Sequence, residues 1–184
     1  MKRTLLALTL LAALPFAASA ADGVSYTYVE GGYTATNTDA GDADGWALKG
    51  SGAIAPNFHL FGEFDKQEIE NTNIDVDNTE IGFGYAHGLT DRMDLIAEAA
   101  YLNTDVQYFG DVDGYRASIG LRGSFTENFE GLIKANYNDG DNADGDFTGT
   151  IGAQYKFSQT WGMVGEATFG DNGETYLVGL RASF

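Results

Sequence analysis

Apolar and polar side chains alternate from Val24 to the last residue, in segments of about ten residues separated by turn-forming residues. A period of two residues is typical of a β-strand whose two faces meet different surroundings. We expect strands at residues 25–36, 45–55, 58–68, 78–87, 93–102, 114–125, 129–138, 146–157, 161–170 and 175–184. The pattern therefore predicts an all-β chain.

The connections between these segments alternate in length. Every second one is short, and the others are longer and mostly rich in Asp, Asn and Gly. Short turns at one end and long loops at the other are typical of a transmembrane antiparallel up-and-down β-barrel, here with ten strands. Eight strands remain an alternative if 25–36 and 78–87 pair differently. The short connections are Pro56-Asn57, 88–92, 126–128 and 158–160.

Within each strand, up to its aromatic residue at the loop end, the charged residues occupy positions of one parity (odd or even), and the residues of the other parity are uncharged. Because a basic side chain facing lipid at mid-depth costs about 2–4 kcal/mol, the uncharged parity is expected to face lipid. A soluble barrel or sandwich with the apolar face buried is the alternative, and alternation alone does not separate the two. The expected inward charges are Glu30, Lys49, Glu63, Asp65, Glu80, Asp94, Glu98, Arg116, Arg122, Glu130, Lys134, Lys156, Glu166 and Arg181.

Aromatic positions favour the membrane barrel, because such barrels concentrate aromatic residues in two belts at the water boundary. One belt is expected at the loop ends of the strands and the other at the turn ends. The first comprises Tyr33, Trp46, Phe64, Tyr101, Tyr115, Tyr137, Phe147, Phe169 and Tyr176. The second comprises Phe58, Tyr85, Phe125, Phe129, Phe157, Trp161 and Phe184.

The first twenty residues are typical of a secretory signal peptide. Lys2 and Arg3 precede an apolar run that ends in Ala18-Ser19-Ala20, and this run is too short to span a bilayer as a helix. We expect cleavage after Ala20 and one barrel domain at 21–184. The chain contains no cysteine, and its net charge of −17 argues against a nucleic-acid partner.

The segment from Tyr176 to Phe184 alternates without a break and ends on phenylalanine. It resembles the C-terminal insertion signal of outer-membrane barrels, so the barrel-assembly machinery is an expected partner through Phe184. Outer-membrane lipids and lipopolysaccharide are the other expected partners, in the bacterial outer membrane or its vesicles.

The eight acidic and six basic inward residues can form pairs with one another. Lys49 should face Glu63 across a hairpin, and Glu166 should reach Arg181 diagonally. Such an interior is expected to be packed rather than open, because a ten-stranded barrel is only slightly wider than the eight-stranded kind that side chains fill. A narrow channel for ions or small solutes is the alternative.

No catalytic, cofactor or metal residue is assigned. His59 is expected inward near a short turn and His87 outward at the same end, and a set of His59, Ser51 and Asp65 is the kind that a small barrel offers by chance. A lipid-modifying enzyme is therefore only a second alternative.

The long connections contain fifteen acidic residues and no Lys or Arg, which suits divalent cations in general. They lack a defined calcium loop, because Ala40 and Gly140 occupy first-ligand positions. The segments are 37–44, 69–78, 103–114, 138–147 and 170–174.

Segments in the N-terminal half resemble a family of small outer-membrane proteins of xanthomonads that is regulated by the diffusible signal factor and was named for a proposed activation of rice immunity. The likeness is carried by SYTYVEGGY (25–33), DADGWALKG (42–50), PNFHLFG (56–62), TNIDVD (72–77) and PFAASA (15–20). It implies a non-enzymatic, porin-like barrel at the surface of a Gram-negative cell, with a structural or interaction role linked to quorum sensing, motility and biofilm.

Overall fold

The computed structural model describes residues 23–39, 41–140 and 143–184, so the expected signal peptide at 1–20 lies outside the described residues. Within these ranges the chain forms ten β-strands. They are β1 (Tyr28–Thr38), β2 (Gly41–Ala55), β3 (Phe58–Ile69), β4 (Asp75–Thr90), β5 (Met93–Val106), β6 (Gly110–Ser124), β7 (Phe129–Gly140), β8 (Ala143–Lys156), β9 (Trp161–Gly170) and β10 (Gly173–Ser183). No helix in the described ranges is long and apolar enough to cross a membrane.

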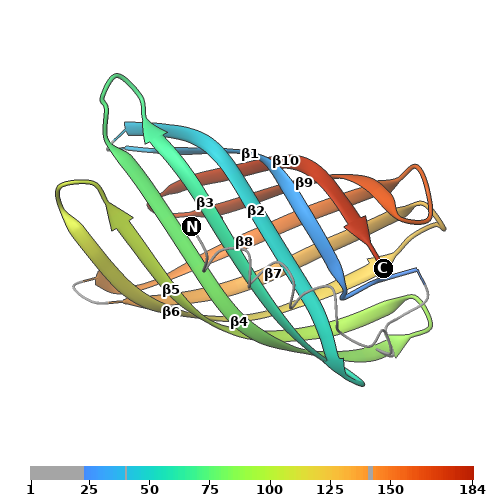
Figure 1. Ribbon diagram of the computed structural model, residues 1–184. Helices are drawn as coiled ribbons and strands as arrows, with labels where there is room; N and C mark the ends of the chain where they lie inside the picture. Colours follow the sequence, from blue (N-terminus) through green and yellow to red (C-terminus); the bar gives the residue numbers. More distant parts are fainter. Residues whose placement is uncertain (1–22, 40, 141–142) are drawn as a thin grey trace, which may run out of the picture.

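The strands form one closed antiparallel barrel in which each strand pairs with its neighbours in sequence and β1 pairs with β10 (Figure 1). The closing ladder runs from Tyr28 opposite Ser183 to Asn37 opposite Glu174. This confirms the ten-stranded barrel. The eight-stranded alternative is wrong, because β1 and β4 each pair along their length with two neighbours.

The connections at the two ends differ less in length than the sequence predicts. At the end that we call the loop end, β5 runs to Val106 and β6 starts at Gly110, so the expected loop 103–114 is mostly strand. The acidic segments 37–44 and 138–147 likewise lie largely in strands. The backbone ladder continues past the last apolar residues because polar side chains on both faces suit water. The opposite end, with Pro56-Asn57, is the turn end.

Burial follows parity in the sense expected for a membrane barrel. Outward residues such as Leu60, Ile81 and Val178 are exposed, whereas inward Glu30, Asp94 and other charged residues are buried. A soluble barrel would show the reverse, so that alternative is wrong. The outward surface is a continuous apolar band suited to hydrocarbon.

The two aromatic belts are present as contacts between neighbouring strands. At the loop end, Tyr101 contacts Tyr115 and Tyr137 contacts Phe147, with ring centroids 6.0 Å and 5.0 Å apart. At the turn end, Phe58 contacts Tyr85 at 5.0 Å. Such cross-strand pairs stabilise a sheet and also mark both boundaries of the apolar band.

Candidate functional site

The candidate site is the lumen, which holds a cavity of about 400 Å³ lined mainly by charged and polar side chains. Its lining begins near the turn end with Tyr26 and His59 and reaches Thr36, Gln67 and Thr104 near the loop end. The interior is therefore neither fully packed nor as wide as a general diffusion pore.

Ion pairs line the wall of this cavity. Lys49 contacts Glu63 at 3.3 Å and Glu166 at 3.0 Å, and Lys134 contacts Glu98 at 3.1 Å. Lys49 lies opposite Glu63 in the ladder, as predicted. Each cation thus has a carboxylate partner that offsets part of its desolvation.

Two of these pairs reach over intervening strands that present glycine. The Lys134–Glu98 pair passes over β6, where Gly120 lies opposite Lys134. The Lys49–Glu166 pair passes over β1 and β10, where Gly32 lies opposite Gly179. Because glycine has no side chain, a long ion pair can lie flat on the wall there and leave the centre of the lumen open.

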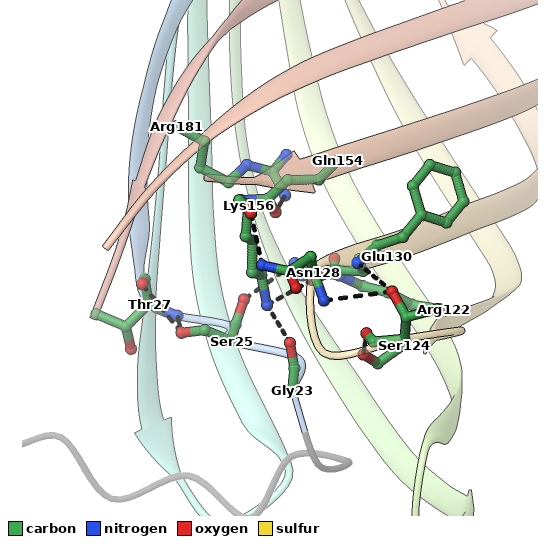
Figure 2. A network of polar contacts seen from close by, with 12 residues as sticks. Gly23, Ser25, Thr27, Arg122, Ser124, Asn128, Glu130, Gln154, Lys156 and Arg181 are labelled. Atoms are coloured by element: carbon green, nitrogen blue, oxygen red, sulfur yellow. Dashed lines mark hydrogen bonds and ion pairs between the residues drawn. The ribbon is translucent and has the colours of Figure 1, made fainter. Parts of the chain in front are cut away.

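The turn end of the lumen is occupied by residues 23–27, which precede β1 and turn into the barrel. Figure 2 shows this segment among side chains of β6, β7, β8 and β10. Lys156 Nζ donates to the Gly23 carbonyl, and the Arg122 guanidinium donates to the Ser25 carbonyl at 3.0 Å. The expected strand 25–36 therefore starts later, at Tyr28, because this segment binds inside.

Tyr26 is the main anchor of the segment and is only 4 % exposed. Its hydroxyl donates to Asp94 at 3.0 Å, its ring stacks on His59 at 4.7 Å, and the Arg122 guanidinium lies 4.8 Å from the ring centroid. Tyr26 also joins a small apolar cluster with Val24, Ala86 and Ile96. Nothing in the alternation of the sequence identifies this role.

Buried charges surround the segment. Arg122 Nε donates to Glu130 at 2.5 Å, and Lys156 lies 3.5 Å from the same carboxylate. Arg181 contacts Glu30 at 2.6 Å. The predicted diagonal pair of Glu166 with Arg181 is therefore corrected: Arg181 lies directly opposite Glu30 across the barrel closure, while Glu166 binds Lys49.

The loop end has a different lining. The residue on the loop side of each belt aromatic points inward, and most of these residues are neutral. Among the described residues of this ring none is Lys or Arg, and Asp65 and Asp146 are the charged ones. Nine residues of the ring adjoin belt aromatics, and the tenth, Asn78 of β4, lies opposite Asp65; the nine are Thr34, Gly45, Asp65, Leu102, Gly114, Asn138, Asp146, Gly170 and Thr175.

The catalytic set drawn from His59, Ser51 and Asp65 is not assembled. His59 Nε2 lies 3.5 Å from Glu98, while the Ser51 hydroxyl donates to the Tyr26 carbonyl at 2.8 Å. Asp65 accepts from Gln67 and Asn78 instead. As predicted, His59 points inward and His87 outward.

Outside the belts, several acidic residues of the loop end contact local partners. Lys66 contacts Asp75 at 2.6 Å and Asp77 at 3.1 Å. Hydrogen bonds from Tyr101 and Asn103 lower the pKa of Asp113, so this carboxylate stays charged in more acidic solution. Within the described ranges, no three His, Asp or Glu residues are grouped to hold a metal ion.

The sequence matches no protein-family model and no curated protein. Its structure is similar to that of an outer-membrane channel from Pseudomonas putida F1, with a TM-score of 0.55 and 8% identity, over 88% of this chain and 96% of that one. The chain has the fold of outer-membrane β-barrels. The KdgM porin gives a TM-score of 0.49 at 18% identity, over 85% of this chain and 99% of that one. At 8% identity, the similarity to the Pseudomonas putida channel supports the fold alone.

Proposed function

We propose that this protein is a non-enzymatic barrel of the bacterial outer membrane whose lumen is a narrow, restricted passage for ions and small solutes. The observation that carries the proposal is the polar cavity of about 400 Å³ that extends from Tyr26 near the turn end to Thr36 and Thr104 near the loop end. By the usual orientation of such barrels, the turn end faces the periplasm and the loop end faces outside.

The proposal is supported by where the charges lie. Because the Lys49–Glu166 and Lys134–Glu98 pairs follow the wall, they line the cavity without filling it. Residues 23–27 narrow the turn end, so the conductance of such a passage should be small. The separation of His59, Ser51 and Asp65 into different hydrogen-bond networks favours a non-enzymatic role.

The test is single-channel recording of the refolded protein in planar bilayers. We expect small conductance steps, and Lys134→Ala and Glu98→Ala should each change their size because both residues line the cavity. Asp77→Asn, in an exterior ion pair with Lys66, is the matched control and should leave the steps unchanged. Bilayers that stay silent with the wild type and with Tyr26→Ala would contradict the proposal.

A second candidate is a structural or interaction role at the cell surface, linked to quorum sensing, motility and biofilm by the family resemblance. It is favoured by Tyr108 and Phe109 at the β5–β6 tip, which are 84 % and 79 % exposed on an otherwise acidic rim. Exposed apolar residues of this kind often mark contact sites.

This second role can be tested on intact cells. Protease added outside should cleave tags inserted at 37–44 and 138–147, and the pair Tyr108→Ser with Phe109→Ser should alter biofilm formation while conductance stays as in the wild type. Lipopolysaccharide and the barrel-assembly machinery stay predicted partners, the latter tested by deletion of Phe184. Protected tags and unchanged biofilm would argue against surface interaction.

A further inference from the structure

We propose that Asp65, with the amides of Gln67 and Asn78, forms a binding site for monovalent inorganic cations at the loop end of the lumen and makes the passage cation-selective. This inference rests on the proposed passage and states which ions the passage accepts. The site lies on the loop side of the aromatic belt, since Asp65 follows Phe64 in β3.

Asp65 is a buried carboxylate without a cationic partner. It is 9 % exposed, and no Lys, Arg or His among the described residues lies within ion-pair distance of it. Its Oδ1 accepts from Gln67 Nε2 at 2.8 Å and from Asn78 Nδ2 at 3.0 Å. Two neutral amides orient this charge but do not neutralise it, so the site lacks one positive charge.

Gln67 supplies the second observation. This side chain is 6 % exposed and lines the same cavity, and its Oε1 has no hydrogen-bond partner because its Nε2 is directed at Asp65. Asn78 Oδ1 accepts from Thr104 on β5, which fixes the Asn78 amide with its Nδ2 toward Asp65 on β3. A buried carbonyl oxygen next to an uncompensated carboxylate is a favourable environment for a cation with oxygen ligands.

The charges near Asp65 favour cations over anions. The ring that contains Asp65 has no Lys or Arg among its described residues, and Arg116, on the turn side of the belt, is paired with Glu80. An ion that enters from the loop end therefore meets negative charge before any positive charge. Acidic groups at a narrow mouth concentrate cations and repel anions.

The ligand set favours weak, exchangeable binding. Within the described ranges no cluster of three or more acidic or histidine side chains is placed to chelate a metal ion. One carboxylate with one amide oxygen suits K⁺ or Na⁺ that keeps part of its water shell. Conduction needs such binding, because an ion held too tightly does not leave.

The experiment measures the reversal potential in a KCl gradient with the full refolded chain. The wild type should prefer K⁺ over Cl⁻, and Asp65→Asn, which keeps shape and removes charge, should lower the permeability ratio several-fold. Asp113→Asn removes the same charge from an exposed residue that bonds to outward-facing Tyr101, so it should leave the ratio unchanged. An unchanged ratio in Asp65→Asn would overturn the inference while the passage itself stood.

A second measurement does not depend on conduction. At equal ionic strength, KCl should raise the unfolding midpoint of the wild type relative to choline chloride, and this difference should disappear in Asp65→Asn because the bound ion stabilises the folded state by mass action. If bilayers are silent but this difference is present, the passage fails and the cation site stands. If the difference is the same in both proteins, the site fails.

Discussion

The two ends of the lumen are built from the same ten strands but have opposite interiors. At the turn end, Arg122 and Glu130 are buried and hold the segment that contains Tyr26. At the loop end, the amides of Gln67 and Asn78 hold Asp65 with no compensating charge. The difference teaches that long paired side chains narrow a small barrel, whereas short neutral ones leave a mouth that water and ions can enter.

The largest effect is expected from breaking the buried pair at the turn end. Arg122→Met leaves Glu130 with only the more distant Lys156, at 3.5 Å, and should cost about 3 kcal/mol of unfolding free energy. Urea unfolding followed by gel mobility measures this. Arg122→Met combined with Glu130→Gln should regain much of the loss. Equal stability of the single variant and the wild type would contradict a tightly packed turn end.

Tyr26→Ala should enlarge the passage at the turn end. The substitution removes the stack on His59, the hydrogen bond to Asp94 and the contact with Arg122, so residues 23–27 lose their main anchor. Single-channel conductance should rise several-fold. Tyr26→Phe retains the ring contacts and should give a smaller rise. If neither variant changes conductance, the segment does not limit flow.

A hydrogen bond in the half of the barrel nearer the loop end should contribute less to stability than the Arg122–Glu130 ion pair at the turn end. Thr150 bonds to Thr168 at 2.9 Å, and Asn136 donates to the same hydroxyl at 2.9 Å. Thr150→Val keeps the shape and should cost about 1 kcal/mol. The same urea assay measures it. A loss as large as that of Arg122→Met would show that the two halves are equally dependent on buried polar contacts.

The smallest effect is expected outside the lumen. Lys66→Met breaks surface ion pairs with Asp75 and Asp77 and should leave the free energy of unfolding nearly unchanged, because water and salt screen such pairs. Conductance should stay at the wild-type value, because Lys66 does not line the cavity. A changed conductance would mean that the rim, rather than the lumen, controls ion flow.

Alternation predicted much of the fold and of the lining. The inward placement of Glu30, Lys49 and His59 follows from parity alone and is confirmed. Parity also places Asp65 in the lumen, but it does not reveal that Asp65 lacks a cation. That property depends on which residues the neighbouring strands bring near it, and no local pattern encodes this.

The turn end shows where local pattern fails. Residues 25 and 26 continue the alternation of β1, yet they lie outside the strand because Tyr26 binds Asp94, His59 and Arg122 in the lumen. These partners come from β5, β3 and β6. Their meeting point exists only after the barrel has closed.

By itself, the sequence determined the strand segments and the face that meets lipid, because both follow from local alternation and from the cost of charge in hydrocarbon, and it favoured ten strands over eight. The tertiary structure decided which charges pair, where the strands end and which end of the lumen is occupied. Those outcomes depend on closure of β1 onto β10, which brings together residues that are far apart in the chain, such as Glu30 and Arg181.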